Sequence, residues 1–208
     1  MAPPADSLIG RSPGRSSPDR RTTPLPALQI QLLSSGASSD ERLVSEITDL
    51  VNRVYGTAED GLWIEGATRT TASEMAALIA AGQIAVSKID GRIAGAIRIQ
   101  QLDAVTGEFA MLVADPARRG EGIGRELLLF AEELSRQRGL GVMQLELLVP
   151  REWTHPTKEF LRAWYTRIGY RSVRSGTIDE SYPQLAPLLA TPCDFVIFRK
   201  DLVSPRSR

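Results

Sequence analysis

One stretch of the sequence constrains the fold more than any other. An apolar run, "EFAMLVA" (108–114), is followed by Asp-Pro, two arginines and three glycines at alternate positions. A long amphipathic pattern, "GIGRELLLFAEELSRQRG" (122–139), comes next. The run is typical of a strand and the pattern of a helix. The glycines allow a tight turn between the two and a close approach of a ligand to the backbone.

This strand, turn and helix together predict an anion-binding site. The first turn of a helix has N–H groups without intrahelical partners, and its end carries partial positive charge. Arg118 and Arg119 add permanently charged donors that suit phosphate. We therefore expect a phosphate-bearing ligand at this loop. The plainer alternative is a strand-to-helix turn with solvated arginines.

Two common phosphate-binding motifs do not match the glycine spacing. A Walker loop has Lys and then Ser or Thr after its last glycine, whereas Arg125 and Glu126 follow Gly124 here. A dinucleotide-binding loop has the pattern Gly-x-Gly-x-x-Gly, whereas these glycines stand at 120, 122 and 124. The loop therefore belongs to some other class of phosphate site.

The rest of the sequence alternates between strand-like and helix-like patterns. We expect strands at 28–33, on both sides of the Asp90-Gly91 hairpin, and at 107–114, 142–149, 170–176 and 194–202. We expect helices at 39–56, with Gly56 as the stop, at 71–82 behind a Thr71-x-x-Glu74 capping box, at 122–139 and at 157–169. This order predicts an α+β fold with a mostly antiparallel sheet and one parallel strand pair.

The composition of the chain limits its domain organisation. Apolar residues make up 42% of the 208 residues, enough for the core of one globular domain. We expect a Pro/Ser/Arg-rich disordered tail at 1–27, a folded domain at 28–203 and a polar tail at 204–208. A transit peptide is the alternative for the first tail. No apolar run is long enough to span a membrane, so no membrane partner is expected.

Net charge and the number of cysteines limit which partners, compartment and metals are expected. Outside the two tails, 19 basic residues face 23 acidic ones, and this balance argues against nucleic acid as the main partner. The single cysteine, Cys193, forms no internal disulfide and fits a reducing compartment, so we expect a cytoplasmic protein. One histidine and one cysteine make a metal site unexpected.

Two segments resemble one known family. "LVADPARRGEGIG" (112–124) is similar to the pyrophosphate loop of the GCN5-related N-acetyltransferase (GNAT) superfamily, and "FLRAWYTRIGYRSV" (160–173) resembles its later helix and strand. The element order from Leu28 to Leu202 also matches. The resemblance implies a sheet of six to seven strands, splayed at one parallel pair and flanked by about four helices.

The resemblance also implies acetyl-CoA as cosubstrate and direct transfer to a small amine, by a monomer or homodimer without a metal. The strand ending Met111-Leu112-Val113 would pair with the pantetheine arm through its backbone. Tyr165 stands where the family has a tyrosine beside the CoA sulfur, the general acid. Lys158 stands where the family often has Asn. The residues expected at the pyrophosphate are Arg118, Arg119, Gly120, Glu121, Gly122, Ile123, Gly124 and Arg125.

A general base is needed because an amine is mostly protonated at neutral pH. Glu108 is our first candidate, since it is the carboxylate inside the central strand and, by strict alternation, shares a face with Ala110 and Leu112. Glu146 in the neighbouring strand is the second candidate. A water relay is the third possibility.

Several residues have plainer expectations. His155 is expected to be a solvated loop residue and Cys193 a small packing residue. Trp63-Ile64-Glu65 and the segment 179–189 would flank the acceptor, as the corresponding regions do in the family. A protein or peptide amine as acceptor, and an acyl-CoA-binding module without catalysis, are the alternatives to small-molecule acetylation.

Overall fold

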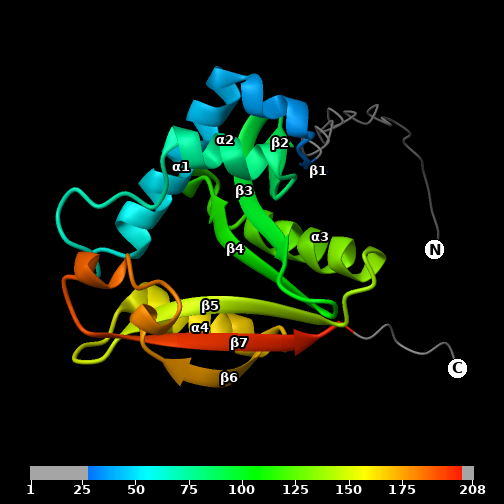
Figure 1. The fold of residues 1–208 in the computed structure, drawn as a ribbon. Coiled ribbons are helices and arrows are strands. Elements are labelled where there is room, and N and C mark those ends of the chain that lie inside the picture. The colour runs from blue at the N-terminus through cyan, green and yellow to red at the C-terminus, as the bar shows by residue number, and fades with distance from the viewer. Residues whose placement is uncertain (1–27, 203–208) are drawn as a thin grey trace, which may run out of the picture.

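The computed structural model describes residues 28–202, so the expectations for both tails lie outside the described residues. Within that range, four α-helices surround a seven-stranded sheet (Figure 1). The expected α+β fold and element order are confirmed. No helix in the described range is long and apolar enough to cross a membrane.

The sheet is mixed, with one parallel pair. Its order is β1-β2-β3-β4-β5-β7-β6, and only β4 and β5 run parallel. The strands are β1 (Gln29–Leu32), β2 (Ile84–Ile89), β3 (Arg92–Gln101), β4 (Thr106–Ala114), β5 (Val142–Pro150), β6 (Arg171–Gly176) and β7 (Cys193–Asp201). Asp90 and Gly91 join β2 to β3 with positive φ angles of 51° and 75°, as the hairpin pattern predicts.

The sheet opens between its two parallel strands. The register of β4 with β5 covers three pairs, from Thr106 with Val142 to Glu108 with Gln144. On their other sides, β4 stays paired with β3 as far as Ala114, and β5 with β7 along its whole length. The two halves of the sheet therefore diverge beyond Glu108, as Figure 1 shows.

The helices are α1 (Glu41–Ala58), α2 (Ala72–Ala80), α3 (Ile123–Gln137) and α4 (Pro156–Arg167). Asp40 caps α1 and accepts a hydrogen bond from the Leu43 N–H, and α2 has the predicted capping box. The expected stop of the first helix at Gly56 is wrong, because α1 continues to Ala58. A glycine ends a helix where it turns left-handed, and Gly56 does not, whereas Gly82, Gly139 and Gly169 do.

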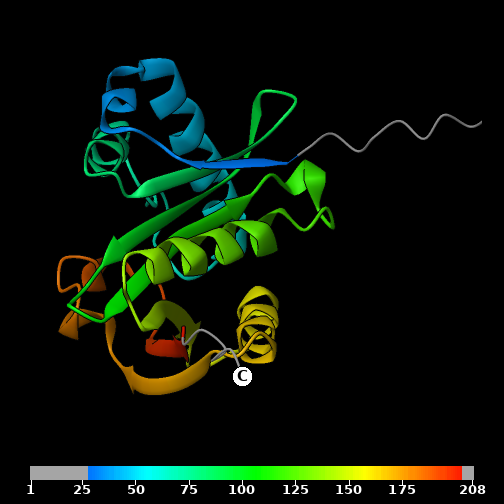
Figure 2. The same cartoon turned by 90° about the vertical axis from the view of Figure 1, so that its right-hand side faces the viewer.

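Three apolar clusters hold these layers together. Helices α1 and α2 cover one face of the first half of the sheet, around Ile47 and Met75. Helices α3 and α4 lie on the opposite side, around Leu127 and Tyr170 (Figure 2). The segment 178–189 between β6 and β7 packs with Leu62, Leu148 and other residues in the third cluster. The opening between β4 and β5 is therefore enclosed on several sides.

Candidate functional site

A cavity of about 820 Å³ occupies the opening between the two halves of the sheet. Its walls come from β4 and β5, the glycine-rich loop, α4, the end of α1 and the segment 178–185. The divergence of β4 from β5 creates this space, because backbone groups that would pair in a continuous sheet face it instead. One cavity thus connects the anion loop with the interior of the sheet.

The glycine-rich loop forms one end of the cavity. Asp115 orders its start by accepting a hydrogen bond from the Ala117 N–H. Gly120 and Gly122 have positive φ angles of 91° and 79°, a conformation that favours glycine. Gly122 is the N-cap of α3 and offers no side chain to the helix, so the N–H groups of its first turn remain for another acceptor.

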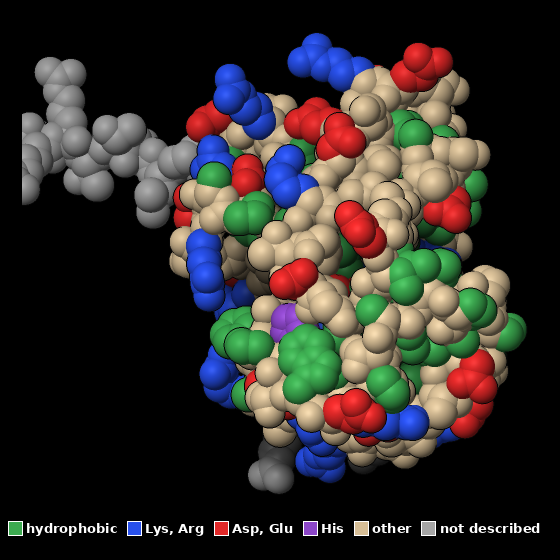
Figure 3. Space-filling model, turned by 90° about the vertical axis from the view of Figure 1, so that its left-hand side faces the viewer, with side chains coloured by type: hydrophobic (Ala, Val, Ile, Leu, Met, Phe, Trp, Pro, Cys, Tyr) green, Lys and Arg blue, Asp and Glu red, His purple; other side chains and the backbone are tan. Residues whose placement is uncertain are grey.

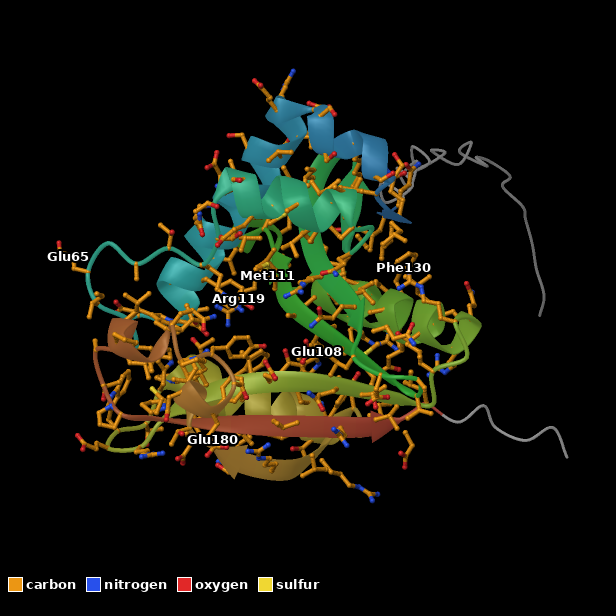
Figure 4. All side chains as sticks on the ribbon, in the orientation of Figure 1. Glu65, Glu108, Met111, Arg119, Phe130 and Glu180 are labelled. Atoms are coloured by element: carbon orange, nitrogen blue, oxygen red, sulfur yellow. The ribbon has the colours of Figure 1, made fainter. Side chains whose placement is uncertain are left out.

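Most of the predicted loop residues lie on the cavity. Its lining includes Arg118, Arg119, Gly120, Gly122, Ile123, Gly124 and Arg125. Glu121 is not part of that lining, and its carboxylate lies 3.2 Å from Nη1 of Arg118. Figure 4 shows Arg119 and Met111 near the same end of β4. The structure therefore places the predicted loop residues on the cavity, apart from Glu121, and their role in ligand binding stays a prediction.

A bulge shapes the β4 wall. Met111 has a φ of 48°, and the β3–β4 register shifts at this point, so two β4 residues stand opposite Ile97. Strict alternation along β4 is therefore wrong. Leu112 packs against the cluster beneath α3, on the face opposite Glu108. Met111 and Leu112 line the cavity, whereas Val113 is buried in the core beneath α1 and α2 and is not part of the lining.

Tyr165 reaches the cavity from α4 and is 5% exposed. Its ring lies 5.9 Å from that of Phe109 and 5.1 Å from that of Trp164, measured between centroids. Burial, and to a smaller extent the neighbouring Tyr55, raises the pKa of Tyr165 far above its usual value. The phenol therefore keeps its proton at neutral pH, and burial makes it a weaker acid than an exposed tyrosine.

Two carboxylates lie in the opening of the sheet. Glu108 is 3% exposed and accepts hydrogen bonds from the side-chain amides of Gln100, at 2.5 Å, and Gln144, at 3.4 Å. Figure 4 shows it between β4 and β5. Glu146 accepts a hydrogen bond of 2.9 Å from the Tyr182 hydroxyl. Burial, with the negative charge of Glu108, raises the pKa of Glu146 to about 7.

The pKa shift changes the ranking of the two base candidates. A general base works best when its pKa lies near the working pH, and the pKa of Glu146 is about 7. Glu146 therefore becomes the stronger candidate and Glu108 the second. No sequence signal reveals this difference, because it arises from burial and from groups on other strands.

Arg69, Arg98 and Glu59 all line the cavity, although the sequence did not indicate them as site residues. Arg69 lies in the loop before α2, with its guanidinium carbon 5.1 Å from the centroid of the Tyr55 ring. Arg98 on β3 donates from Nε to Gln83, at 2.8 Å, and from Nη2 to Gln100, at 2.6 Å. Glu59 at the end of α1 is the third. These residues are remote from the motifs, and only the fold brings them to the cavity.

Lys158 has a different partner from the one its position in the family pattern implies. Its Nζ lies 2.5 Å from Oε1 of Glu59, and the side chains of this pair are 3% and 10% exposed. The Trp63 indole donates to the other Glu59 oxygen at 2.6 Å. This ion pair lines the cavity and joins α4 to the end of α1.

The two loops expected at the acceptor meet at the cavity. An isolated bridge pairs Trp63 with Leu189. Trp63, Tyr182 and two further residues of the second loop, Ile178 and Leu185, line the cavity. Ile64 is 45% exposed and Glu65 points away from the cavity in Figure 4, so neither belongs to its wall.

The expectation for His155 is wrong and that for Cys193 is confirmed. His155 is 6% exposed and caps α4, with Nδ1 accepting from the Thr157 N–H at 3.2 Å. In Figure 3 its side chain shows as a small purple area beside hydrophobic side chains. Cys193 is buried in an apolar cluster, and burial raises its pKa to about 11. Within residues 28–202, no group of three or more acidic, histidine or cysteine residues is placed to hold a metal ion.

A comparison with protein-family models gives one match. The model of the acetyltransferase (GNAT) domain matches residues 80–172, which include β3 to β5, the glycine-rich loop and α4. No curated protein matches the sequence at the same stringency.

Solved structures share the fold at low sequence identity. An aminoglycoside 6'-N-acetyltransferase complexed with coenzyme A has a TM-score of 0.63 and 15% identity, covering 86% of this chain and 99% of its own. The aminoglycoside 6'-N-acetyltransferase from Enterococcus faecium has a TM-score of 0.61 and 14% identity, with the same coverage. N-acetylglutamate synthase from Neisseria gonorrhoeae, complexed with coenzyme A and N-acetyl-glutamate, has a TM-score of 0.58 and 16% identity. The match covers 86% of this chain and only 36% of that longer enzyme.

Proposed function

Because the chain belongs to the GCN5-related N-acetyltransferase superfamily, a group of acyltransferases, we propose that it moves an acetyl group from acetyl-CoA directly to a primary amine of a small molecule. One observation carries this proposal. A single cavity runs from an anion-binding loop to a pair of carboxylates and a buried tyrosine. These are the groups that binding a nucleotide thioester and removing a proton from an amine require.

The loop fits a pyrophosphate. A Cβ built on Gly120, Gly122 or Gly124 has no atom within 4 Å, so the space beside each glycine is free for a ligand. The N–H groups at the start of α3 would donate to phosphate oxygens. Arg119 adds a charge that forms no ion pair with a carboxylate within the described range, unlike Arg118 and Arg125.

The β4 wall fits the rest of the donor. Beyond Glu108, the edge of β4 that faces β5 has no strand partner. Its backbone groups near Met111 would bind the pantetheine amides and polarise the thioester carbonyl. This supports the assignment of Met111, Leu112 and Val113 to donor binding through their main chain.

The cavity contains one side chain to accept a proton from the amine and one to give a proton to the sulfur. As the neutral amine nitrogen bonds to the acetyl carbon, the carbon–sulfur bond breaks, one proton leaves the nitrogen and one reaches the sulfur; an acceptor that arrives as an ammonium ion loses one further proton to solvent beforehand. Glu146, with its raised pKa, would take the first proton. Tyr165 holds the second proton and would deliver it. Glu108 would serve as base if the amine lay closer to β4, and a water relay remains the third possibility.

The loops favour a small acceptor over a peptide. The bridge between Trp63 and Leu189 joins the two segments that flank the acceptor end of the cavity. An open groove for an extended peptide would need these segments apart. We also propose a cytoplasmic location, since the single cysteine fits a reducing compartment.

Thiol release tests the proposed function. Purified protein with acetyl-CoA should release free CoA faster when primary amines are added, and the acetylated amine should appear in equal amount by mass spectrometry. The rate should depend on both substrates in the pattern of a ternary complex, without a burst of thiol before the amine is added. Binding of acetyl-CoA without turnover on any amine or peptide would instead support a binding module.

A further inference from the structure

Two arginines at the acceptor end of the cavity lack an anionic partner. Arg69 and Arg98 both line the cavity, from the loop before α2 and from β3. The ion pairs found among residues 28–202 involve neither of them. Most other buried or half-buried cations are paired, as Lys158 and Lys200 are with Glu59 and Glu132.

Arg98 is held in place by neutral groups. Within the described range its hydrogen bonds go to the amide oxygens of Gln83 and Gln100, which orient the guanidinium without forming an ion pair. Gln100 also donates to Glu108, so Arg98 and Glu108 are connected through one amide. This arrangement holds the Arg98 guanidinium near the carboxylates without a direct ion pair to either of them.

Arg69 carries a buried donor without a partner. Its Nε is inaccessible to solvent and makes no hydrogen bond within the described part of the chain. Buried donors are satisfied in the great majority of cases, so an exception calls for an explanation. The guanidinium stacks over Tyr55, whose ring is itself part of the cavity wall. Arg69 lines the cavity, so its positive charge would attract an anionic group of a ligand bound there.

Opposite charges share this end of the cavity. The positive charges of Arg69 and Arg98 both lower the pKa of Glu146, against the larger raising effects of burial and Glu108, so all four groups influence the same space. A polyamine would bring further positive charge to the two unpaired arginines. A molecule with an amine and an anion would satisfy both the carboxylates and the arginines.

We propose that the acceptor is a small amine that also carries a carboxylate, of the α-amino acid type, with its amine toward Glu146 and its carboxylate on Arg98 and Arg69. This inference rests on the proposed acetyltransferase function and specifies its substrate class. Trp63, Ile178 and Leu185 on the adjoining wall give an apolar side chain a surface to pack against.

The matched substrates are the proteinogenic α-amino acids and their α-carboxamides. Each pair shares the same side chain and amine, and only the carboxylate differs. The amine of the carboxamide is the less basic of the two, so more of it is unprotonated and its intrinsic bias favours the amide. We expect kcat/KM to be about 10- to 100-fold higher for the favoured acids than for their amides, as charge-assisted hydrogen bonds to a carboxylate would produce.

Two variants test whether the arginines cause the preference for acids over amides. In Arg98→Gln and Arg69→Gln, the ratio of kcat/KM for acid over amide should fall toward one. Arg92→Gln replaces an exposed arginine on the same strand as Arg98 and outside the cavity, and it should keep the ratio. Tm values and CoA affinity of each variant show whether the cavity has kept its structure.

The outcomes separate the two proposals. Acids preferred by the native protein, with the preference lost in Arg98→Gln and kept in Arg92→Gln, would support a carboxylate-bearing acceptor. Equal or faster acetylation of the amides, or of amines without any anion, would overturn this substrate class and leave the acetyltransferase function standing. Acetylation of no amine in the panel, by a protein that binds CoA, would overturn the proposed function and this inference with it.

Discussion

Single residues in this cavity are tuned by what buries them. The pKa values of Tyr165 and Glu146 are both raised, in each case chiefly because burial disfavours the charged form. The consequences differ, because the shifted phenol stays protonated and becomes a weaker acid, while a carboxylate with a pKa of about 7 exchanges its proton near neutral pH. The two side chains could therefore serve the two proton transfers of one reaction.

Tyr165→Phe tests the donor. The ring packs among Phe109, Trp164 and Tyr170, and the variant keeps that packing, so Tm and CoA affinity should change little. We expect kcat and kcat/KM to fall alike by about 10²–10⁴-fold, because the lost proton is needed only as the thiolate leaves. A thioester of a more acidic thiol should suffer a smaller loss. Near-normal turnover in the variant would exclude this role.

The pH dependence of kcat/KM tests the base. If Glu146 takes the proton, activity requires its ionised form and should rise with pH through about 7. Four groups face it: Glu108 raises its pKa, while Tyr182, Arg69 and Arg98 lower it. In Glu108→Gln the rise should move to lower pH, and in Tyr182→Phe to higher pH. Loss of all activity in Glu108→Gln at every pH would identify Glu108 as the base instead.

At the scale of elements, the glycine-rich loop and α3 combine an anion site with a close packing contact. The loop side of α3 is open, as the free space at Gly124 shows. The opposite side packs so closely on β3 that a Cβ at Gly95 would lie 2.9 Å from both Ile123 and Leu127, and it would also lie 2.6 Å from the Val113 carbonyl oxygen of β4. There is therefore room for a side chain at Gly124, at the start of α3, and no room for one at Gly95, where β3 packs against the helix.

Arg119→Ala and Gly124→Val should weaken CoA binding for different reasons. Arg119→Ala removes a charge-assisted contact, and we expect an affinity loss of about 10- to 100-fold. Gly124→Val places a branched side chain in space that the protein leaves empty, so the expected loss falls on the ligand and not on the backbone. Calorimetric titration with CoA measures both effects. Unchanged affinity in the two variants would contradict the phosphate site.

Gly95→Ala should destabilise the fold. The added methyl group would collide with the Val113 carbonyl and the side chains of Ile123 and Leu127, so α3 must shift away from β3. We expect a loss of about 1–3 kcal/mol in the free energy of unfolding. Gly141→Ala is the control, because a Cβ there has nothing within 4 Å. Equal Tm values for the two variants would show that the structure accommodates the added methyl group at Gly95 without losing stability.

At the scale of the whole molecule, the divided sheet is bridged by polar contacts across its opening. The Lys158–Glu59 ion pair connects α4 with the end of α1, and the bridge between Trp63 and Leu189 connects the loop after α1 with the segment 178–189. The Tyr182–Glu146 hydrogen bond fastens that segment to β5 in the same half of the sheet. Trp63 adds a second contact to Glu59. The walls of the cavity are therefore held together around a space that the fold itself leaves open.

Removing one partner of the buried ion pair should cost more than removing both charges. Lys158→Met leaves the Glu59 carboxylate buried with only the Trp63 indole, and we expect a loss of about 3–5 kcal/mol. The double variant with Glu59→Gln should recover part of that loss, because no buried charge remains. Urea unfolding of the single and double variants measures the difference. A double variant no more stable than Lys158→Met would show that the pair's charge is unimportant.

Local sequence signals determined the order of elements and the anion loop. The capping box at Thr71, the Asp90-Gly91 hairpin and the glycines before α3 each act through neighbouring residues, so they can be read from a linear pattern. The family resemblance added the expectation of a mixed sheet with one parallel strand pair, and the structure confirms it. Gly56 shows the limit of such signals, because neighbouring helical residues carried α1 through it.

Tertiary structure alone decided the chemistry at the acceptor end. The bulge at Met111 placed Glu108 and Leu112 on opposite faces of β4, although strict alternation predicts one face. The raised pKa of Glu146 and the unpaired Arg69 arise from groups distant in sequence. Burial and electrostatic fields act through space, so residues that are unremarkable in a linear pattern acquire their properties only when the fold encloses them together.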